Sequence, residues 1–232
     1  TQDCPSNVYT TWNYLAGGAS SKIQSGGWAN GSTYVATTTS NESCSFPSSL
    51  AFKGTGKYYI EFKVGSDGAD FSVGIGETDA MDYYINNTSS KLKFCNYSKG
   101  WAYTKGGNKE NNGSGSSYGD SFTDYDYIGL AWNNGTLWFS KNGTWQNSAT
   151  ISEINAGTTT NAAYTGLDTS ANYYIMFDGY NDAMIEMNAG NGYFRTTEIT
   201  SPNNPSSGDT GAKFKYPVPT GLQPISTKGF NE

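Results

Sequence analysis

The sequence contains no histidine. Histidine is the most frequent general base in enzymes, and the Ser-His-Asp and Cys-His arrangements of hydrolases depend on it. A glycoside hydrolase could still use two carboxylates. Glu61 lies in a predicted strand, but the alternation of its neighbours places it opposite the core-facing residues, where a solvent-facing side chain is expected. We therefore predict a protein that is not an enzyme and has no catalytic residues.

Cysteine is also scarce, with three residues far apart in the sequence: Cys4, Cys44 and Cys95. An odd number without paired spacing argues against a disulfide scaffold, and a zinc site would need closely spaced Cys or His. Three small buried or free thiols are expected, and a Cys4–Cys44 bridge remains an alternative.

Acidic residues gather at Asp79 and Asp82 and again at Asp120, Asp124 and Asp126, where loop carboxylates could bind Ca²⁺. Their spacing does not match an EF-hand, and acidic residues are common in turns. We predict no metal site and no cofactor.

Charged residues make up only 15% of the sequence, against about 25% in an ordinary domain. The net charge is -6, and Arg195 is the single arginine, so no basic stripe is available to neutralise a phosphate backbone. No stretch approaches the roughly 20 apolar residues of a membrane helix. Neither a nucleic-acid partner nor a membrane span is expected.

Glycine and aromatic residues are abundant, with 29 Gly, 18 Tyr, 11 Phe and 6 Trp. Aromatic and β-branched side chains favour strands, whereas Gly and Asn favour the turns between them. Apolar residues nowhere recur at helical spacing over ten or more positions. The composition therefore predicts an all-β domain with negligible helix.

Several segments alternate with the period of two that is typical of half-buried strands. Residues 57–64 and 71–75 are predicted to form one hairpin. Residues 127–145 (YIGLAWNNGTLWFSKNGTW) contain two Asn-Gly pairs, which predict two tight turns and an antiparallel meander. Further strands are expected at 173–177 and 183–187, with DGYND as the turn between them. The polar segments 104–121 and 200–213 are predicted to be long surface loops.

Aromatic residues near the polar loops are candidates for binding. Trp101, Tyr103 and Tyr118 flank the 104–121 segment, and Tyr83 and Tyr84 lie in a second polar stretch. Exposed rings of this kind suit glycan or peptide surfaces. The alternative is that the rings pack and pin their own loops.

Four motifs, in order, resemble a SPRY domain: GKYYIEFKV; VGIGETD; GWAYTKGGNKENNGSGSSYGDSFTDYDYIGLAWNNGTLWFSKNGTW; and FKYPVPTGLQPIST. They are most similar to the SPRY domains of phage and marine viral structural proteins of the tail-fibre or spike type. The opening NVYTTWNYLAGGASSKIQSGGWANGSTYVAT resembles the lead-in strand of those proteins, so the likeness extends from about Val8 to Thr227.

The resemblance implies a bent antiparallel β-sandwich, a concanavalin-like jelly roll, used for binding. It implies one domain over residues 1–232, with a lead-in strand within 1–50 and an inserted loop or arm at 189–213. That insertion separates Asn188 from the closing FKY motif by more residues than in other members, and could contact a neighbouring subunit. Binding in such domains is assigned to edge loops, here 79–90 and 104–121. The predicted ligand-binding residues are Tyr83, Tyr84, Trp101, Tyr103, Lys105, Asn112, Tyr118 and Asp120.

The resemblance favours a non-catalytic virion module, namely a tail fibre, spike or capsid appendage. Its expected partners are other virion proteins and a host-surface glycan or protein, its location is the virion (the extracellular particle), and a homo-oligomer is expected. The alternatives are an intracellular SPRY-type adaptor that binds a short peptide and, with less support, a carbohydrate-active enzyme.

Overall fold

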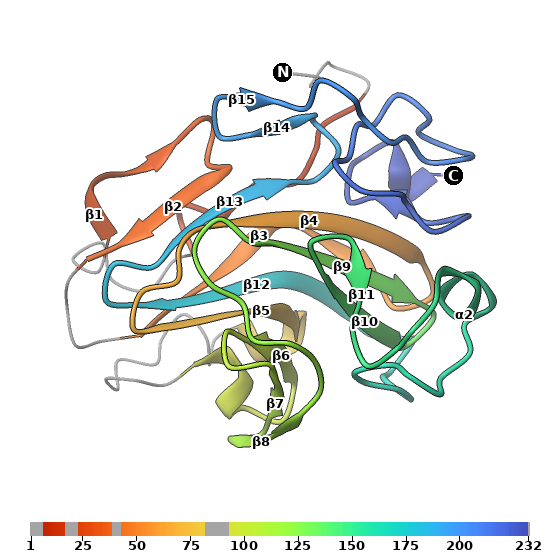
Figure 1. Ribbon diagram of the computed structural model, residues 1–232, viewed down its shortest axis with the longest axis horizontal. Helices are drawn as coiled ribbons and strands as arrows, with labels where there is room; N and C mark the ends of the chain where they lie inside the picture. The colour runs from red at the N-terminus through yellow and green to blue at the C-terminus, as the bar shows by residue number, and fades with distance from the viewer. Residues whose placement is uncertain (1–6, 17–22, 39–42, 82–92, 232) are drawn as a thin grey trace.

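Two antiparallel β-sheets pack face to face in the computed structural model, which describes residues 7–16, 23–38, 43–81 and 93–231 (Figure 1). The first sheet has the order β1 (Ile23–Ala29), β2 (Tyr34–Thr37), β13 (Met184–Asn188), β4 (Lys57–Ser66), β9 (Tyr127–Asn133), β10 (Thr136–Lys141) and β11 (Thr144–Trp145). The short strand β16 (Gln223–Pro224) pairs in parallel with β4. The second sheet has the order β3 (Cys44–Lys53), β12 (Asn172–Tyr180), β5 (Asp70–Glu77), β6 (Gly100–Thr104), β7 (Asn108–Asn111) and β8 (Ser114–Ser117). The prediction of an all-β sandwich is confirmed.

The helical elements within the described residues are α2 (Ile151–Ala156) and three single 3₁₀ turns, η2 (Thr78–Ala80), η3 (Phe94–Asn96) and η4 (Gly229–Asn231), and Met81 directly after η2 is also helical. The N-terminus of α2 is closed by a capping box, in which Thr150 Oγ1 accepts a hydrogen bond from the backbone N–H of Glu153 at 3.2 Å. Gly157, with φ of 71°, ends the helix in the left-handed conformation. These local signals explain a helix too short for periodicity to reveal.

Both predicted Asn-Gly turns are confirmed. Asn134 and Gly135 have φ of 46° and 82°, and Asn142 and Gly143 have φ of 50° and 82°. Two consecutive positive φ values match the twist of the flanking strands, so each pair closes a tight hairpin. Strands β9, β10 and β11 consequently form the expected meander.

The predicted hairpin of residues 57–64 and 71–75 is wrong, although both strands exist. Strand β4 pairs with β9 and β13 in the first sheet, whereas β5 pairs with β12 and β6 in the second. The connection between them therefore crosses from one layer to the other, and so does the connection between β12 and β13. Alternation identifies a strand and its buried face, but a short turn can join strands of different sheets.

The segment 104–121, predicted as a long loop, contains the hairpin β7–β8. Its four paired positions run from Asn108 opposite Ser117 to Asn111 opposite Ser114. Asn112 and Gly113, with φ of 52° and 69°, make its turn. The sequence does not predict these two strands, because they lie at the edge of the second sheet. There, polar residues take the place of the apolar alternation that is typical of a half-buried strand.

Aromatic side chains fill the space between the sheets. The Trp132 ring lies 5.5 Å from that of Phe52 and 4.8 Å from that of Tyr173, and its Nε1 donates a hydrogen bond to Gly54 O at 3.0 Å. Towards the other end of the core, Trp12 packs between Phe62 and the second sheet. The tryptophans of the meander are therefore part of the architecture.

Residues 1–50 and 189–213 differ in detail from what was expected. The described part of the first region contains three strands, β1, β2 and β3, rather than one lead-in strand. In the second region, β14 (Tyr193–Phe194) and β15 (Thr197–Glu198) form a small hairpin. The following residues, up to 213, pack against the body of the protein, since Asp209 is 2% exposed and Ala212 is fully buried. A contact to another subunit through this region stays a prediction.

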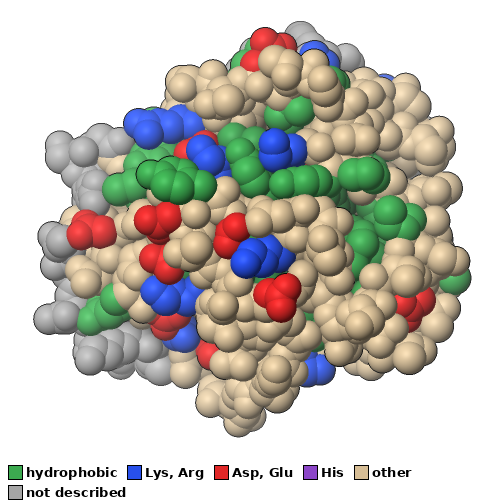
Figure 2. Space-filling model, in the orientation of Figure 1, with side chains coloured by type: hydrophobic (Ala, Val, Ile, Leu, Met, Phe, Trp, Pro, Cys, Tyr) green, Lys and Arg blue, Asp and Glu red, His purple; other side chains and the backbone are tan. Residues whose placement is uncertain are grey.

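Figure 2 shows a mostly uncharged polar face, on which hydrophobic side chains gather in a band and acidic and basic side chains are intermixed, without a broad patch of one charge. In the described ranges, no helix combines the length and the hydropathy that a membrane crossing requires. Cys44 and Cys95 are buried, while Cys4 lies outside the described residues, so the Cys4–Cys44 bridge stays an open prediction.

Trp132→Ala should lower the free energy of unfolding by about 3–5 kcal/mol, because it removes the ring that joins the two sheets and leaves a cavity. Chemical denaturation followed by fluorescence measures the change. The matched control is Tyr125→Ala, which truncates a ring that is 69% exposed and should change stability by less than about 0.5 kcal/mol. Equal losses in the two variants would contradict this account of the core.

Candidate functional site

Three of the predicted binding rings are buried in the structure. Trp101 is 9% exposed, Tyr118 5% and Tyr103 not at all. Tyr103 stacks on Phe139 at 5.3 Å, and its hydroxyl donates a hydrogen bond to the carbonyl of Asp120. These rings pin their own loops, as the alternative interpretation held. Trp101 and Tyr103 belong to β6. Their spacing of two residues places both rings on the same face of a strand, and this spacing is the sequence signal that indicates their burial.

The other predicted residues do not form one patch. Lys105 forms an ion pair with Asp67, with Nζ 3.3 Å from Oδ2. Asp120 is exposed near the base of the β7–β8 hairpin. Asn112 is exposed at the opposite end of this hairpin, about 14 Å away for four residues of strand. Tyr83 and Tyr84 lie outside the described residues. Ligand contact by the eight residues stays a prediction.

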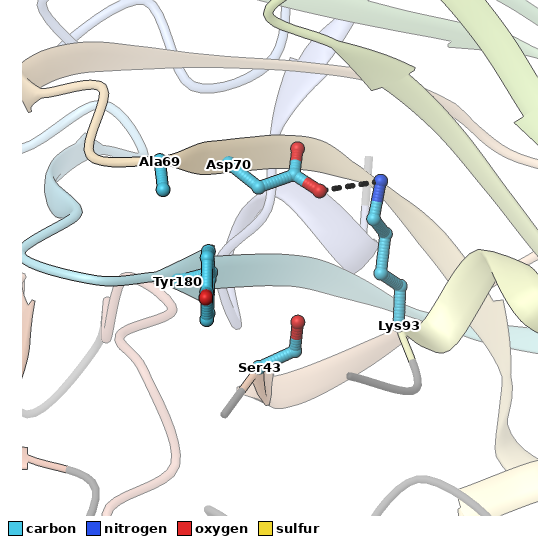
Figure 3. A pocket seen from close by; sticks show the side chains of 5 residues that line it. All are labelled: Ser43, Ala69, Asp70, Lys93 and Tyr180. Atoms are coloured by element: carbon cyan, nitrogen blue, oxygen red, sulfur yellow. Dashed lines mark ion pairs between the residues drawn. The ribbon is translucent and has the colours of Figure 1, made fainter. Parts of the chain in front are cut away.

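A cluster of charged side chains that the sequence did not reveal lies on the outer face of the second sheet. Lys93 Nζ lies 2.7 Å from Asp70 Oδ2 and 3.3 Å from Glu110 Oε2. Figure 3 shows Lys93 reaching across to Asp70 at the start of β5. Cys95 Sγ lies 3.6 Å from the same Glu110 oxygen. The cluster therefore fastens residues 93–96 to both β5 and the β7–β8 hairpin.

The cluster holds its lysine in the charged form. Burial by itself lowers the pKa of Lys93, but Asp70 and Glu110 outweigh burial and raise this pKa above its ordinary value. Burial, followed by nearby carboxylates, raises the pKa of the Cys95 thiol. A protonated lysine and a protonated thiol are poor nucleophiles. The chemistry of this cluster is therefore that of a structural clamp.

Next to the clamp is a cavity of about 230 Å³, lined by Ser43, Ala69, Asp70, Lys93 and Tyr180 (Figure 3). It is open to solvent and combines one cation, one carboxylate, a phenol and a hydroxyl. Such a lining can orient a polar group of a partner by hydrogen bonds. Among the described residues, no three Cys, Asp or Glu side chains are arranged to hold a metal ion.

The expectation that Glu61 faces solvent is wrong. Its side chain is fully buried, because the segment around Tyr216 covers the outer face of β4. The carboxylate accepts hydrogen bonds from the backbone N–H groups of Lys215 and Tyr216, both at 2.8 Å, from the Tyr59 hydroxyl at 3.0 Å and from Asn188 Nδ2 at 3.2 Å. Burial raises the pKa of Glu61 to about 7, even though these four donors oppose the shift.

This geometry does not suit glycoside hydrolysis. Such a mechanism needs two carboxylates that face a substrate across a few ångströms. The partners of Glu61 are amides and a phenol, and its side chain is fully buried. Glu61 instead fixes the closing segment of the chain to the central strand.

A second buried carboxyl, Asp178, lies on the outer face of β12. One of its oxygens accepts a hydrogen bond from Ser45 Oγ at 2.7 Å, and the other has no partner in the structure. Burial raises the pKa of Asp178 well above its ordinary value. A neutral acid in this position avoids the cost of a buried unpaired charge.

No protein-family model matches the sequence, and no curated protein matches it. Among solved structures, the chain is similar to the SPRY domain of human HERC1, with a TM-score of 0.53 over 76% of this chain and 96% of that domain, at 15% sequence identity. The fold is a SPRY-type β-sandwich. At this identity the similarity establishes the fold alone, so the viral variety of the SPRY-type fold stays a prediction.

The buried carboxylate of Glu61 should make stability depend on pH. Its pKa is about 7 when folded against 4.5 as the reference value, so the folded state binds the proton more tightly. Glu61 should therefore make the free energy of unfolding fall by at most about 3 kcal/mol as pH rises from about 4.5 to 7. Denaturation at a series of pH values measures the total decline, which Glu61→Gln should reduce. An identical pH profile for the two proteins would contradict this assignment.

The Lys93 clamp should show a measurable pairwise coupling. We expect a double-mutant cycle with Lys93→Met and Glu110→Gln to give about 1 kcal/mol in favour of the pair, because both side chains are largely shielded from solvent. The matched control is the Lys99–Asp79 pair, whose exposed charges are screened by water and should couple more weakly. A larger coupling in the control pair would contradict the shielding argument.

Proposed function

We propose that this chain is a non-catalytic recognition module that binds a partner through loops carried by a rigid sandwich. SPRY domains are typically interaction modules without catalytic activity. The observation that carries the proposal is the β7–β8 hairpin, whose strand β8 is exposed along its whole length while Lys93 and Tyr164 anchor its base strand. A fixed, polar, exposed edge can bind a partner at a small cost in ordering.

The anchoring of the hairpin is specific. Tyr164 donates a bifurcated hydrogen bond from its hydroxyl to the carbonyls of Ala102 and Glu110, at 2.9 Å each. Lys109 Nζ donates to Ala163 O at 2.8 Å. Together with the Lys93–Glu110 ion pair, these bonds fix β7, and the tip around Asn112 is presented in a defined position.

For the finer function, we propose a virion structural or adhesion module of a tail fibre, spike or capsid appendage, as the sequence motifs suggest. It would bind a host-surface glycan or protein, or a neighbouring virion protein, and would act as a homo-oligomer. The alternative is an intracellular SPRY adaptor that binds a short peptide. The fold is equally consistent with both.

The test is a comparison of host-cell adsorption with peptide capture, using the purified chain. If the purified chain adsorbs to host cells and excess unlabelled chain competes with it, the adhesion module is supported. If the chain captures peptides that share one motif, the adaptor is supported. Asn112→Lys should weaken the productive interaction at least about tenfold, because a charge at the hairpin tip would be desolvated on binding. The control is Thr220→Lys, at an exposed position outside the hairpin.

Two results would count against the proposal. If cell adsorption and peptide capture both fail at high concentration of the chain, a purely structural role is favoured instead. If the Asn112 and Thr220 variants behave alike in an interaction that does occur, the β7–β8 hairpin is not the binding edge.

A further inference from the structure

A second, larger cavity lies away from the β7–β8 hairpin. Its volume is about 340 Å³, within the lower part of the range of small-molecule sites. It lies where the β1–β2 turn meets the β14–β15 hairpin, which Figure 1 shows close together above β13. The lining residues are Asn30, Thr33, Asn191, Tyr193, Arg195 and Thr196.

Arg195 occupies a strained position in this cavity. It begins the two-residue turn between β14 and β15, with φ of 52°. Glycine is the residue that such positions favour, and a positive φ costs other residues roughly 1–2 kcal/mol. An arginine at this point is a reason to look for a function of its side chain.

The guanidinium group of Arg195 is oriented but not neutralised. Its central carbon lies 4.4 Å from the centroid of the Tyr34 ring, and Tyr34 is itself buried. Stacking of this kind restricts the side chain before a ligand arrives. Among the described residues Arg195 forms no ion pair. Glu186, opposite Tyr34 in the sheet, pairs with Lys63 through Oε1 at 3.4 Å, and its Oε2 is buried without a hydrogen-bond partner.

A buried amide in the same cavity has an unused acceptor. Asn191 is 8% exposed and lines the cavity, and its Oδ1 has no hydrogen-bond partner in the structure. An unsatisfied buried polar atom costs about 1–3 kcal/mol, and a hydrogen bond to a ligand hydroxyl or amide N–H would recover this cost once the amide turns toward the cavity. The Thr33 hydroxyl and the half-buried ring of Tyr193 complete a lining of amide, hydroxyl and aromatic groups.

We propose that this cavity binds a carboxylate-bearing sugar residue at the end of a glycan. The ligand carboxylate would pair with the two outer N–H groups of Arg195, since the planar guanidinium matches a carboxylate. Sugar hydroxyls would bond Asn191 and Thr33, and the sugar face would lie on Tyr193. The net charge of -6 disfavours a polyanionic chain and therefore favours one terminal acidic residue. The inference rests on the proposed recognition function and names a ligand class for it.

The test is calorimetric titration of the full chain with 3′-sialyllactose and with a disaccharide that ends in glucuronic acid. We expect at least one of them to bind, and neutral lactose and sodium acetate to bind at least about tenfold more weakly. Arg195→Met should reduce the affinity to that of lactose, and Arg195→Lys should lower it roughly tenfold, because lysine cannot make the bidentate pair. The matched control is Lys53→Met, which removes an exposed charge elsewhere and should leave the affinity unchanged.

A second variant separates the site from general charge effects. Asn191→Ala should weaken binding of the acidic sugar and leave the thermal midpoint within a few degrees of the wild type, since the amide oxygen makes no internal hydrogen bond. The inference is overturned if neither acidic sugar binds, if binding does not depend on Arg195, or if acetate binds as tightly as the sugars.

The two proposals can fail separately. A chain that adheres to cells or captures a peptide, but shows no Arg195-dependent sugar binding, overturns the inference and leaves the recognition function in place. A chain that binds neither cells, peptides nor sugars overturns both.

Discussion

Strand β4 is buried on both of its faces, and the rest of the structure is organised around this burial. Tyr58, Ile60, Phe62 and Val64 point into the space between the two sheets, where aromatic rings from the second sheet meet them. On the opposite face, Tyr59 packs against Phe214, with ring centroids 5.0 Å apart. Because both rows must be covered, the closing segment of the chain is needed as a third layer over the first sheet.

Glu61 is the polar anchor of this third layer. A carboxylate with two backbone N–H donors and two side-chain donors is satisfied on all sides, so its burial is tolerated despite the desolvation that raises its pKa. The same arrangement excludes substrate from the carboxylate. A carboxylate on a central strand makes Glu61 a catalytic candidate in the sequence. The structure explains this carboxylate as an anchor for the closing segment.

The two cavities differ in what the surrounding residues leave available. At the Lys93 cavity the cation is bound by two carboxylates, so the groups there mainly hold the hairpin and the preceding segment in place. At the Arg195 cavity the cation is stacked on a ring and the adjacent amide oxygen has no partner. The same scaffold therefore keeps one charged group satisfied and leaves the other without an ion pair.

The sequence by itself determined the all-β class and the two Asn-Gly turns, because these depend on local preferences for alternation and positive φ. The SPRY-type fold followed from the resemblance of four motifs. It also located most of the long strands. The pairing of β4 and β5 was missed, since a turn of a few residues does not specify whether the next strand stays in the same sheet. The hairpin β7–β8 was missed because its edge position removes the apolar alternation.

Only the tertiary structure decided which polar and aromatic residues are available to a ligand. Tyr103 lies beside the polar segment 104–121 and Tyr118 lies within it, yet both are inside the core. Glu61 is on the outer face of a strand yet lies under residues 215 and 216. Tyr34 and Arg195, which are 161 positions apart in the numbering, come together through β2, β13 and β14. Burial and proximity of this kind depend on contacts between distant segments, and local patterns in a sequence do not encode them.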